Sequence, residues 1–128
     1  MRLLLDTHAL IWWDKSPQLL PSNVLAAMRQ TSCEIFFSAA SVWEAQIKIA
    51  LGKLDLRIPL PQLVEGQLKN GLNLLPIQLP HIWALADLPR LHGDPFDRLL
   101  VAQARHEGMT LVSADSIMRE YAVEVLWA

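Results

Sequence analysis

The chain has 128 residues, of which 52% are hydrophobic and 19% charged, and its formal net charge is −2. This size suits a single domain, which we expect to span residues 1–128. The net charge excludes a basic field over the whole surface, so any nucleic-acid contact would use a local patch or a metal ion. The lone cysteine, Cys33, excludes an internal disulfide and a cysteine-based zinc site. The apolar runs are shorter than the ~18 residues of a membrane span. Asp6 interrupts the first run, which argues against a secretory signal and favours a cytoplasmic protein without membrane attachment.

Five short apolar runs are predicted to form strands. Each run is bounded by polar or turn residues and is apolar at consecutive positions, which is typical of strands buried on both faces. In chain order these runs span residues 2–6, 34–39, 72–77, 109–115 and 122–127.

Helices are predicted between the strands. Ser41 and Glu44 have the spacing of a capping box, whereas Asp94 is expected to cap a later helix that Gly108 ends. Strands that alternate with helices indicate an α/β fold, in which a mostly parallel sheet is covered on both faces. The predicted helices span residues 22–30, 41–52, 59–71, 80–88, 94–108 and 116–121.

Four acidic residues occupy comparable places in these predicted units. Asp6 and Asp115 end strands, and Glu44 and Asp97 lie in the first turns of helices. In an open parallel sheet, the ends of the strands and the starts of the helices share one edge, where ligands bind. Each acid also has an ordinary interpretation as a helix or turn cap, so capping and a shared site are both open for each residue taken alone.

A cluster of these acids would shift its pKa values or disperse unless a cation held it. Two carboxylates ~4 Å apart repel by about 4 kcal/mol at an effective dielectric constant near 20. The four histidines are scattered along the chain, so the ligands on offer are hard carboxylate oxygens. Such ligands favour Mg²⁺ or Mn²⁺ over zinc, and these ions act on phosphates.

Four segments resemble the PIN-domain family, and most closely its VapC-type toxins. They read LLLDTHALIWW, SAASVWEAQIKIALGKLDL, GDPFDRLLVAQA and LVSAD, in the family's order along nearly the whole chain. The resemblance implies a three-layer α/β/α sandwich with a five-stranded sheet of order 3-2-1-4-5. It also implies a Mg²⁺- or Mn²⁺-dependent ribonuclease whose catalytic and metal-binding residues are Asp6, Glu44, Asp97 and Asp115.

The same resemblance implies the partners and the reaction. VapC-type proteins hydrolyse RNA so that a 5′-phosphate and a 3′-hydroxyl remain, they usually dimerise, and a cognate antitoxin blocks the acidic pocket. Supporting roles follow for four neighbouring residues. Thr7 would orient Asp6 or a metal-bound water, Asp94 would mainly cap its helix, and Ser113 supplies a hydroxyl where relatives often have threonine. Arg98 either pairs with a carboxylate or grips a phosphate.

The chain and several of its residues also have other interpretations. A PIN-like domain that binds RNA or a protein without cleaving is the main alternative. A receiver-type phosphoacceptor domain would need an aspartate ending the third strand and a lysine ending the fifth, and the sequence has neither. Lys48 fits a solvated ion pair with Glu44 better than a phosphate contact. His8 is expected to pack or hydrogen-bond, and His92 to be solvated.

Overall fold

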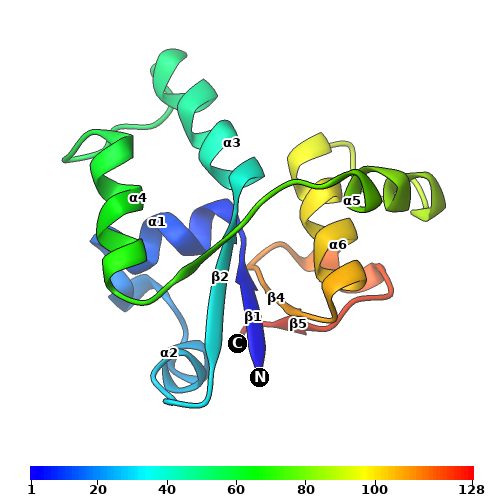
Figure 1. Ribbon diagram of the computed structural model, residues 1–128, viewed down its shortest axis with the longest axis horizontal. Helices are drawn as coiled ribbons and strands as arrows, with labels where there is room; N and C mark the ends of the chain where they lie inside the picture. The colour runs from blue at the N-terminus through cyan, green and yellow to red at the C-terminus, as the bar shows by residue number, and fades with distance from the viewer.

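The computed structural model describes residues 1–128 and contains one parallel five-stranded sheet (Figure 1). The strand order is β3-β2-β1-β4-β5, and every neighbouring pair is parallel. The fold class and strand order expected from the sequence are therefore confirmed. The strands are β1 (Arg2–Leu5), β2 (Glu34–Ser38), β3 (Asn73–Leu75), β4 (Thr110–Val112) and β5 (Val125–Leu126).

This strand order also decides against the receiver-type alternative. Receiver domains have the flavodoxin-like order 2-1-3-4-5, in which the third strand lies next to the first. Here β3 is an edge strand that pairs only with β2, and β1 lies between β2 and β4. The topology is therefore incompatible with a receiver domain.

Six α-helices and three short 3₁₀ helices connect the strands. One of them, α1, follows β1 directly and is missing from the sequence prediction, because its segment continues the apolar character of the strand. None of the helices has the length and apolar character needed to cross a membrane. The helices are α1 (Thr7–Lys15), α2 (Ser22–Met28), α3 (Ala39–Ala50), α4 (Leu60–Lys69), α5 (Leu79–Ala84) and α6 (Pro95–Glu107), with η1 (Pro17–Leu19), η2 (Leu85–Asp87) and η3 (Ser116–Glu120).

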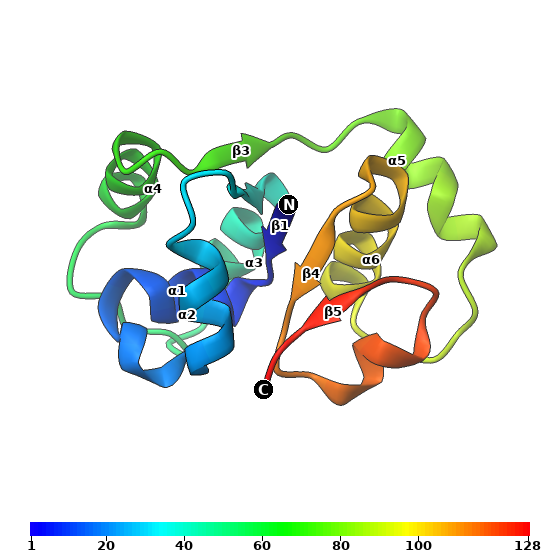
Figure 2. The ribbon, with the colours of Figure 1, turned by 90° about the horizontal axis from the view of Figure 1, so that it is seen from below.

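Alternate residues of β1 supply two separate hydrophobic clusters, one on each face of the sheet. Leu3 and Leu5 pack with residues of α1 and α2, whereas Leu4 packs with residues of α6 and β4. All three leucines are fully buried, as expected for the central strand of a sheet covered on both faces. Figure 2 shows α1 and α2 on one side of the strands and α5 and α6 on the other.

The start of α3 differs from the predicted capping box. The helix begins at Ala39, and its N-cap is Ser38, whose hydroxyl accepts a hydrogen bond from the Ala40 N–H at 3.0 Å. Ser41 therefore lies within the helix, and Glu44 lies in its second turn. The capping-box prediction was wrong because the strand-like run hides a cap three residues earlier, and this leaves Glu44 free for another role.

The start of α6 agrees with the prediction. Asp94 is the N-cap, and its Oδ1 accepts from the backbone N–H groups of Phe96 (2.8 Å) and Asp97 (3.2 Å). The helix ends at Gly108, whose φ of 67° lies in the left-handed region that glycine adopts without strain. Both ends of α6 are thus fixed, which holds its first turn at the edge of the sheet.

The Leu4→Ala variant tests the packing of the central strand. Because Leu4 is fully buried, the substitution removes apolar contacts and leaves a cavity, and we expect the free energy of unfolding to fall by about 2–5 kcal/mol. Chemical denaturation measures this change. The matched control is Leu74→Ala in edge strand β3, where the side chain is 44% exposed, and its cost should be below about 1 kcal/mol. Equal costs for the two variants would contradict the described core.

Candidate active site

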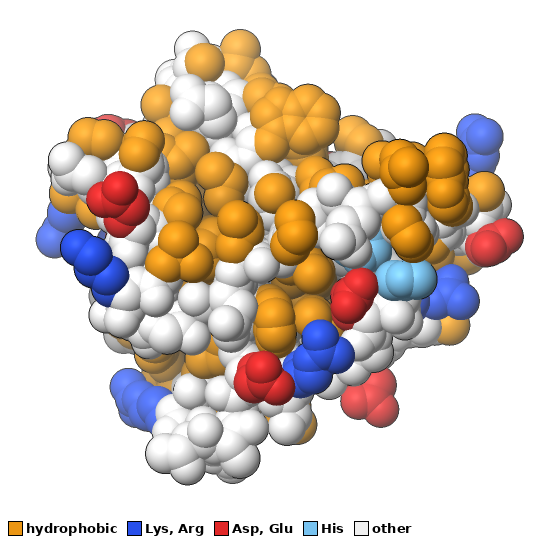
Figure 3. Space-filling view, in the orientation of Figure 1, with side chains coloured by type: hydrophobic (Ala, Val, Ile, Leu, Met, Phe, Trp, Pro, Cys, Tyr) orange, Lys and Arg blue, Asp and Glu red, His pale blue; other side chains and the backbone are white.

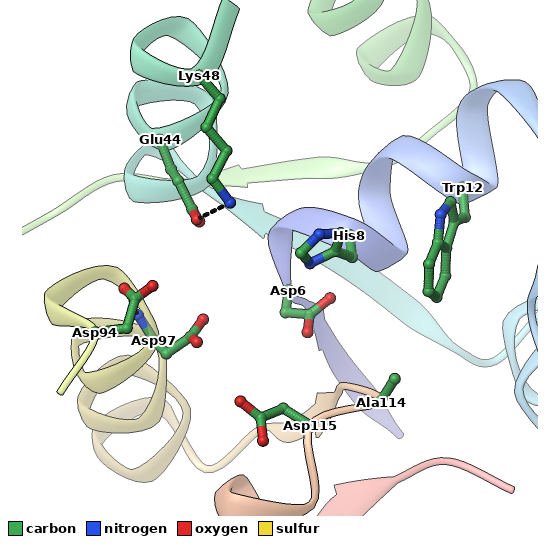
Figure 4. Close-up of a pocket in the computed structure, with 9 residues that line it drawn as sticks. All are labelled: Asp6, His8, Trp12, Glu44, Lys48, Asp94, Asp97, Ala114 and Asp115. Carbon is green, nitrogen blue, oxygen red and sulfur yellow. Dashed lines mark hydrogen bonds and ion pairs between the residues drawn. The ribbon is translucent and has the colours of Figure 1, made fainter. Parts of the chain in front are cut away.

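An acidic pocket of about 330 Å³ opens where the carboxyl ends of β1 and β4 meet the first turns of α1 and α6 (Figure 4). All four sequence-predicted acids line it, although they come from different elements. Figure 4 shows their carboxylates around one common space. The lining residues are Asp6, His8, Trp12, Glu44, Lys48, Asp94, Asp97, Ala114 and Asp115.

Asp6 combines a structural and an electrostatic role. It follows β1 as the N-cap of α1, and its Oδ1 accepts the Ala9 N–H at 2.8 Å. Burial raises the pKa of Asp6 above its usual value, although the Ser113 hydroxyl and the Ala9 N–H act in the opposite direction. Asp6 is therefore a rigidly held carboxyl whose negative charge is costly without a nearby cation.

Glu44 is held at both of its carboxylate oxygens. The buried Thr7 hydroxyl donates to Oε1 at 2.6 Å, and the Lys48 ammonium lies 2.8 Å from Oε2. The hydrogen bond with Glu44 raises the pKa of Lys48, which keeps its ammonium charged. The predicted ion pair is present, although its Glu44 end is buried and not, as expected, solvated. Lys48 is the one lysine or arginine among the residues that line the pocket. Thr7 therefore bonds to Glu44, whereas the sequence suggested that it would orient Asp6 or a metal-bound water.

Asp97 projects into the pocket from the first turn of α6. Its backbone N–H is capped by Asp94, but its own carboxylate makes no return bond to the Asp94 N–H, which binds His92 instead. Burial and the nearby negative charge of Asp94 raise the pKa of Asp97 to about 7, with smaller contributions from Asp6 and Glu44. Burial is thus the main reason that ionisation of Asp97 is disfavoured, and the neighbouring acids add to it.

Asp115 has the opposite electrostatic balance. Partial burial works against its ionisation, but hydrogen bonds from the Ile117 N–H and from His92 outweigh it and lower the pKa of Asp115. Its Oδ1 caps η3 by accepting from Ile117 at 3.0 Å, and its backbone N–H donates to the Ser113 hydroxyl at 3.1 Å. Ser113 therefore contacts the loop that carries Asp115 and also faces Asp6.

Sequence reasoning missed the contribution of His92, which was expected to be solvated. Its Nε2 lies 3.0 Å from Asp97 Oδ2 and 2.8 Å from Asp115 Oδ2, so it bridges two of the four acids. The sequence did place His92 near the site, since it precedes the Asp94 cap by two residues. Its orientation depends, however, on contacts that are distant in the chain.

Arg98 forms no ion pair with a carboxylate. Its guanidinium donates to the carbonyl of Pro89 at 2.8 Å and lies 3.5 Å from both the carbonyl of Leu85 and the hydroxyl of Tyr121. Of the two predicted roles, carboxylate pairing is therefore wrong. Arg98 instead anchors the segment before α6, and this segment carries His92 and Asp94.

The donor set fits a hard divalent cation. Five carboxylates and one lysine line the pocket, and its acids come from the carboxyl edge of the sheet. Burial is the main cause of the raised pKa values of Asp6 and Asp97, so a nearby cation would stabilise the charged form of each carboxyl. Carboxylate oxygens are the ligands that Mg²⁺ and Mn²⁺ prefer.

This architecture defines an α/β protein with a carboxylate-lined site at the carboxyl edge of its sheet. The PIN domain family model matches residues 3–124, and the chain belongs to this family. A relative named Ribonuclease VapC22, from Mycobacterium tuberculosis, is 32% identical over 125 residues, which cover 93% of this chain and 91% of the relative.

Solved structures show the same fold. The crystal structure of VapBC2 from Rickettsia felis, bound to a DNA fragment from the promoter, matches over 100% of both chains with a TM-score of 0.78 and 15% identity. FitAcB from Neisseria gonorrhoeae matches over 97% of this chain and 96% of that chain, with a TM-score of 0.62 and 18% identity. VapBC-1 from nontypeable Haemophilus influenzae matches over 98% and 97%, with a TM-score of 0.63 and 15% identity.

The raised pKa of Asp97 predicts a pH-dependent cost to stability. The pKa of Asp97 is about 7 in the folded chain, against a usual value of 3.8, so the stability that this group contributes at low pH is lost as the pH rises through 7. Asp97→Asn should therefore raise the free energy of unfolding at pH 8 by about 2 kcal/mol, after allowance for solvent screening, and by much less near pH 4.

Denaturant titrations at both pH values, in chelator-containing buffer, measure this difference. Asp115→Asn is the matched control, because the pKa of Asp115 is lowered and its ionised form stabilises the folded chain. That variant should be less stable than the wild type at pH 8. A pH-independent effect of Asp97→Asn would show that the pocket does not penalise its charge.

Proposed function

We propose that this chain is a divalent-cation-dependent ribonuclease that acts as the toxin of a type II toxin–antitoxin pair. The observation that carries the proposal is the gathering of Asp6, Glu44, Asp97 and Asp115 around one pocket. Membership of the PIN domain family and the relative named a ribonuclease support it. The reaction is hydrolysis of an RNA phosphodiester, which leaves a 5′-phosphate and a 3′-hydroxyl.

Asp6, Asp97 and Asp115 would hold Mg²⁺ or Mn²⁺, and Glu44 would complete the acidic lining. When bound, the cation supplies the positive charge that stabilises the phosphodiester and activates water for attack. The protein's own contribution is a rigid arrangement of oxygens. Asp6 is fixed by the Ala9 N–H, and Glu44 is fixed by Thr7 and Lys48.

The Lys48 ammonium would also favour an RNA phosphate at the pocket. Its side chain is 35% exposed, and Glu44 is its one ion-pair partner. Asp94 is engaged as the N-cap of α6, so its role in the reaction is to fix the first turn of the helix that carries Asp97. Ser113 supports the loop that carries Asp115 through its hydroxyl.

RNA cleavage tests the proposal directly. Purified chain incubated with RNA and Mg²⁺ or Mn²⁺ should cleave it, and EDTA should abolish cleavage. Asp6→Asn should reduce the rate by about 100-fold or more, because it removes a charged oxygen ligand. Gel electrophoresis of end-labelled RNA measures the rate and identifies the new ends.

The matched control is Asp55→Asn, which changes an exposed acid outside the pocket and should leave the rate unchanged. Cleavage that persists with EDTA and in Asp6→Asn would overturn the cation-dependent mechanism. Failure of the wild type to cleave any RNA, with RNA binding retained, would favour a domain that binds without cleaving.

The exposed apolar surface favours binding to other protein chains. In Figure 3, hydrophobic side chains gather over α3 and α5. Such surfaces mark interaction sites, so we propose that the chain forms a homodimer and also binds a cognate antitoxin encoded beside it. The exposed large hydrophobic side chains on these helices are Trp43, Ile47, Leu79, Ile82 and Trp83, and exposed Leu51 follows α3 as its C-cap.

Substitution of Trp83 tests the homodimer. This side chain is 65% exposed on α5, so Trp83→Ser should preserve the fold while it removes apolar contact area. Light scattering should give twice the 14.4 kDa chain mass for the wild type and a shift toward 14.4 kDa for the variant. Leu19→Ser, at an exposed position in η1, is the control and should remain dimeric. A monomeric wild type would contradict the proposal.

A further inference from the structure

His92 connects carboxylates that come from two separate elements. Its Nε2 is 3.0 Å from Asp97 Oδ2, on α6, and 2.8 Å from Asp115 Oδ2, which follows β4. The His92 side chain is only 16% exposed, so these contacts are made largely out of solvent. A single ring nitrogen thus lies between two acids that would otherwise repel each other.

The other ring nitrogen fixes the tautomer. His92 Nδ1 accepts the backbone N–H of Asp94 at 3.1 Å, and a ring nitrogen that accepts an N–H carries no proton of its own. The proton of the neutral ring must then be on Nε2, which donates it to Asp115 Oδ2, while Asp97 Oδ2 lies 3.0 Å from the same nitrogen. In this orientation Nε2 has no lone pair to offer a cation, so His92 is not a metal ligand.

The backbone of His92 is fixed from outside the pocket. The backbone N–H of His92 donates to the Tyr121 hydroxyl at 2.9 Å, and Arg98 binds the Pro89 carbonyl at 2.8 Å in the same segment. Asp94, which donates to the ring, is itself fixed as the N-cap of α6. The position of His92 is therefore set by groups that do not line the acidic pocket, apart from Asp94.

We propose that His92 is a positioning residue for the cation site. Its Nε2–H donates to Asp115 and lies against Asp97, so that it holds the two carboxylates beside each other, and the ligands left for a cation are oxygens alone. This inference rests on the proposed function, since it assumes that a divalent cation binds these acids. Hydrogen-bonded partners of metal ligands commonly account for a 10–100-fold difference in metal affinity.

Calorimetric titration with Mn²⁺ alone tests the proposal without an activity assay. We expect His92→Leu to bind Mn²⁺ about 10-fold more weakly than the wild type, because the donor is lost. His92→Gln carries an amide N–H that can replace Nε2–H, so it should recover most of the affinity. His106→Gln, at an exposed histidine outside the pocket, is the control and should match the wild type.

Tyr121→Phe keeps every acid and the ring but removes the acceptor of the His92 backbone N–H. It should weaken Mn²⁺ binding about 2–5-fold, and it provides a second variant should His92→Leu fail to fold. Equal Mn²⁺ binding by folded His92→Leu would overturn the proposal, because His92 would then contribute nothing to the site. Tighter binding would overturn it as well, because it would mean that His92 competes with the cation.

Nitrogen-15 NMR of the imidazole ring gives a readout independent of affinity. The proton should be on Nε2 of His92 both without and with Mg²⁺. A proton on Nδ1, or loss of the Nε2 proton on addition of Mg²⁺, would assign His92 as a ligand and refute the positioning role. If the wild type binds Mn²⁺ as expected but cleaves no RNA, the ribonuclease proposal fails while the role of His92 stands. No Mn²⁺ binding by the wild type overturns both.

Discussion

Electrostatic repulsion among carboxylates is the constraint on which the site depends. The parallel sheet brings Asp6 and Asp115 to one edge, and the first turn of α6 brings Asp97 to the same place. The chain offsets part of this cost with backbone N–H groups, since Asp6, Asp94 and Asp115 are all N-caps. The choice posed by the sequence between caps and site residues is therefore not exclusive, because capping bonds supply positive partial charge where the acids gather.

The hydrogen-bond donors that compensate the negative charge are shared unequally among the acids, so the carboxyls differ in how readily they ionise. Asp115 receives donors from Ile117 and His92, and its pKa is lowered. Asp97 receives less help, and burial together with Asp94 raises its pKa to about 7. Burial raises the pKa of Asp6 as well, so ionisation of two carboxyls is disfavoured in this pocket. A pocket of this kind is suited to a cation that arrives from solution, because the cation would stabilise both charged forms.

Much of the fold could be predicted from local sequence, because buried parallel strands are short continuous apolar runs. The same property hid α1, whose apolar segment continues from β1, and hid the cap of α3 at Ser38. The gathering of the acids followed from topology, since strand ends and helix starts share one edge. The roles of His92 and Arg98 could not be predicted, because they depend on Tyr121 and on carbonyls that come close only in the folded chain.

Glu44 illustrates what three-dimensional contacts add to a list of acids. In the sequence it is equivalent to the other three, and its spacing suggests a cap. In the folded chain, Thr7 and Lys48 occupy one oxygen each; Thr7 makes its contact from α1, and Lys48 makes its contact from the next turn of α3. A carboxylate restrained at both oxygens contributes to the charge and shape of the pocket but cannot move to follow a ligand.

The oxygens that are less restrained are those of Asp97 and Asp115, and the contacts with His92 limit their movement as well. The site is thus preorganised by neutral and cationic donors around its rim, so that binding a cation requires little rearrangement of the protein.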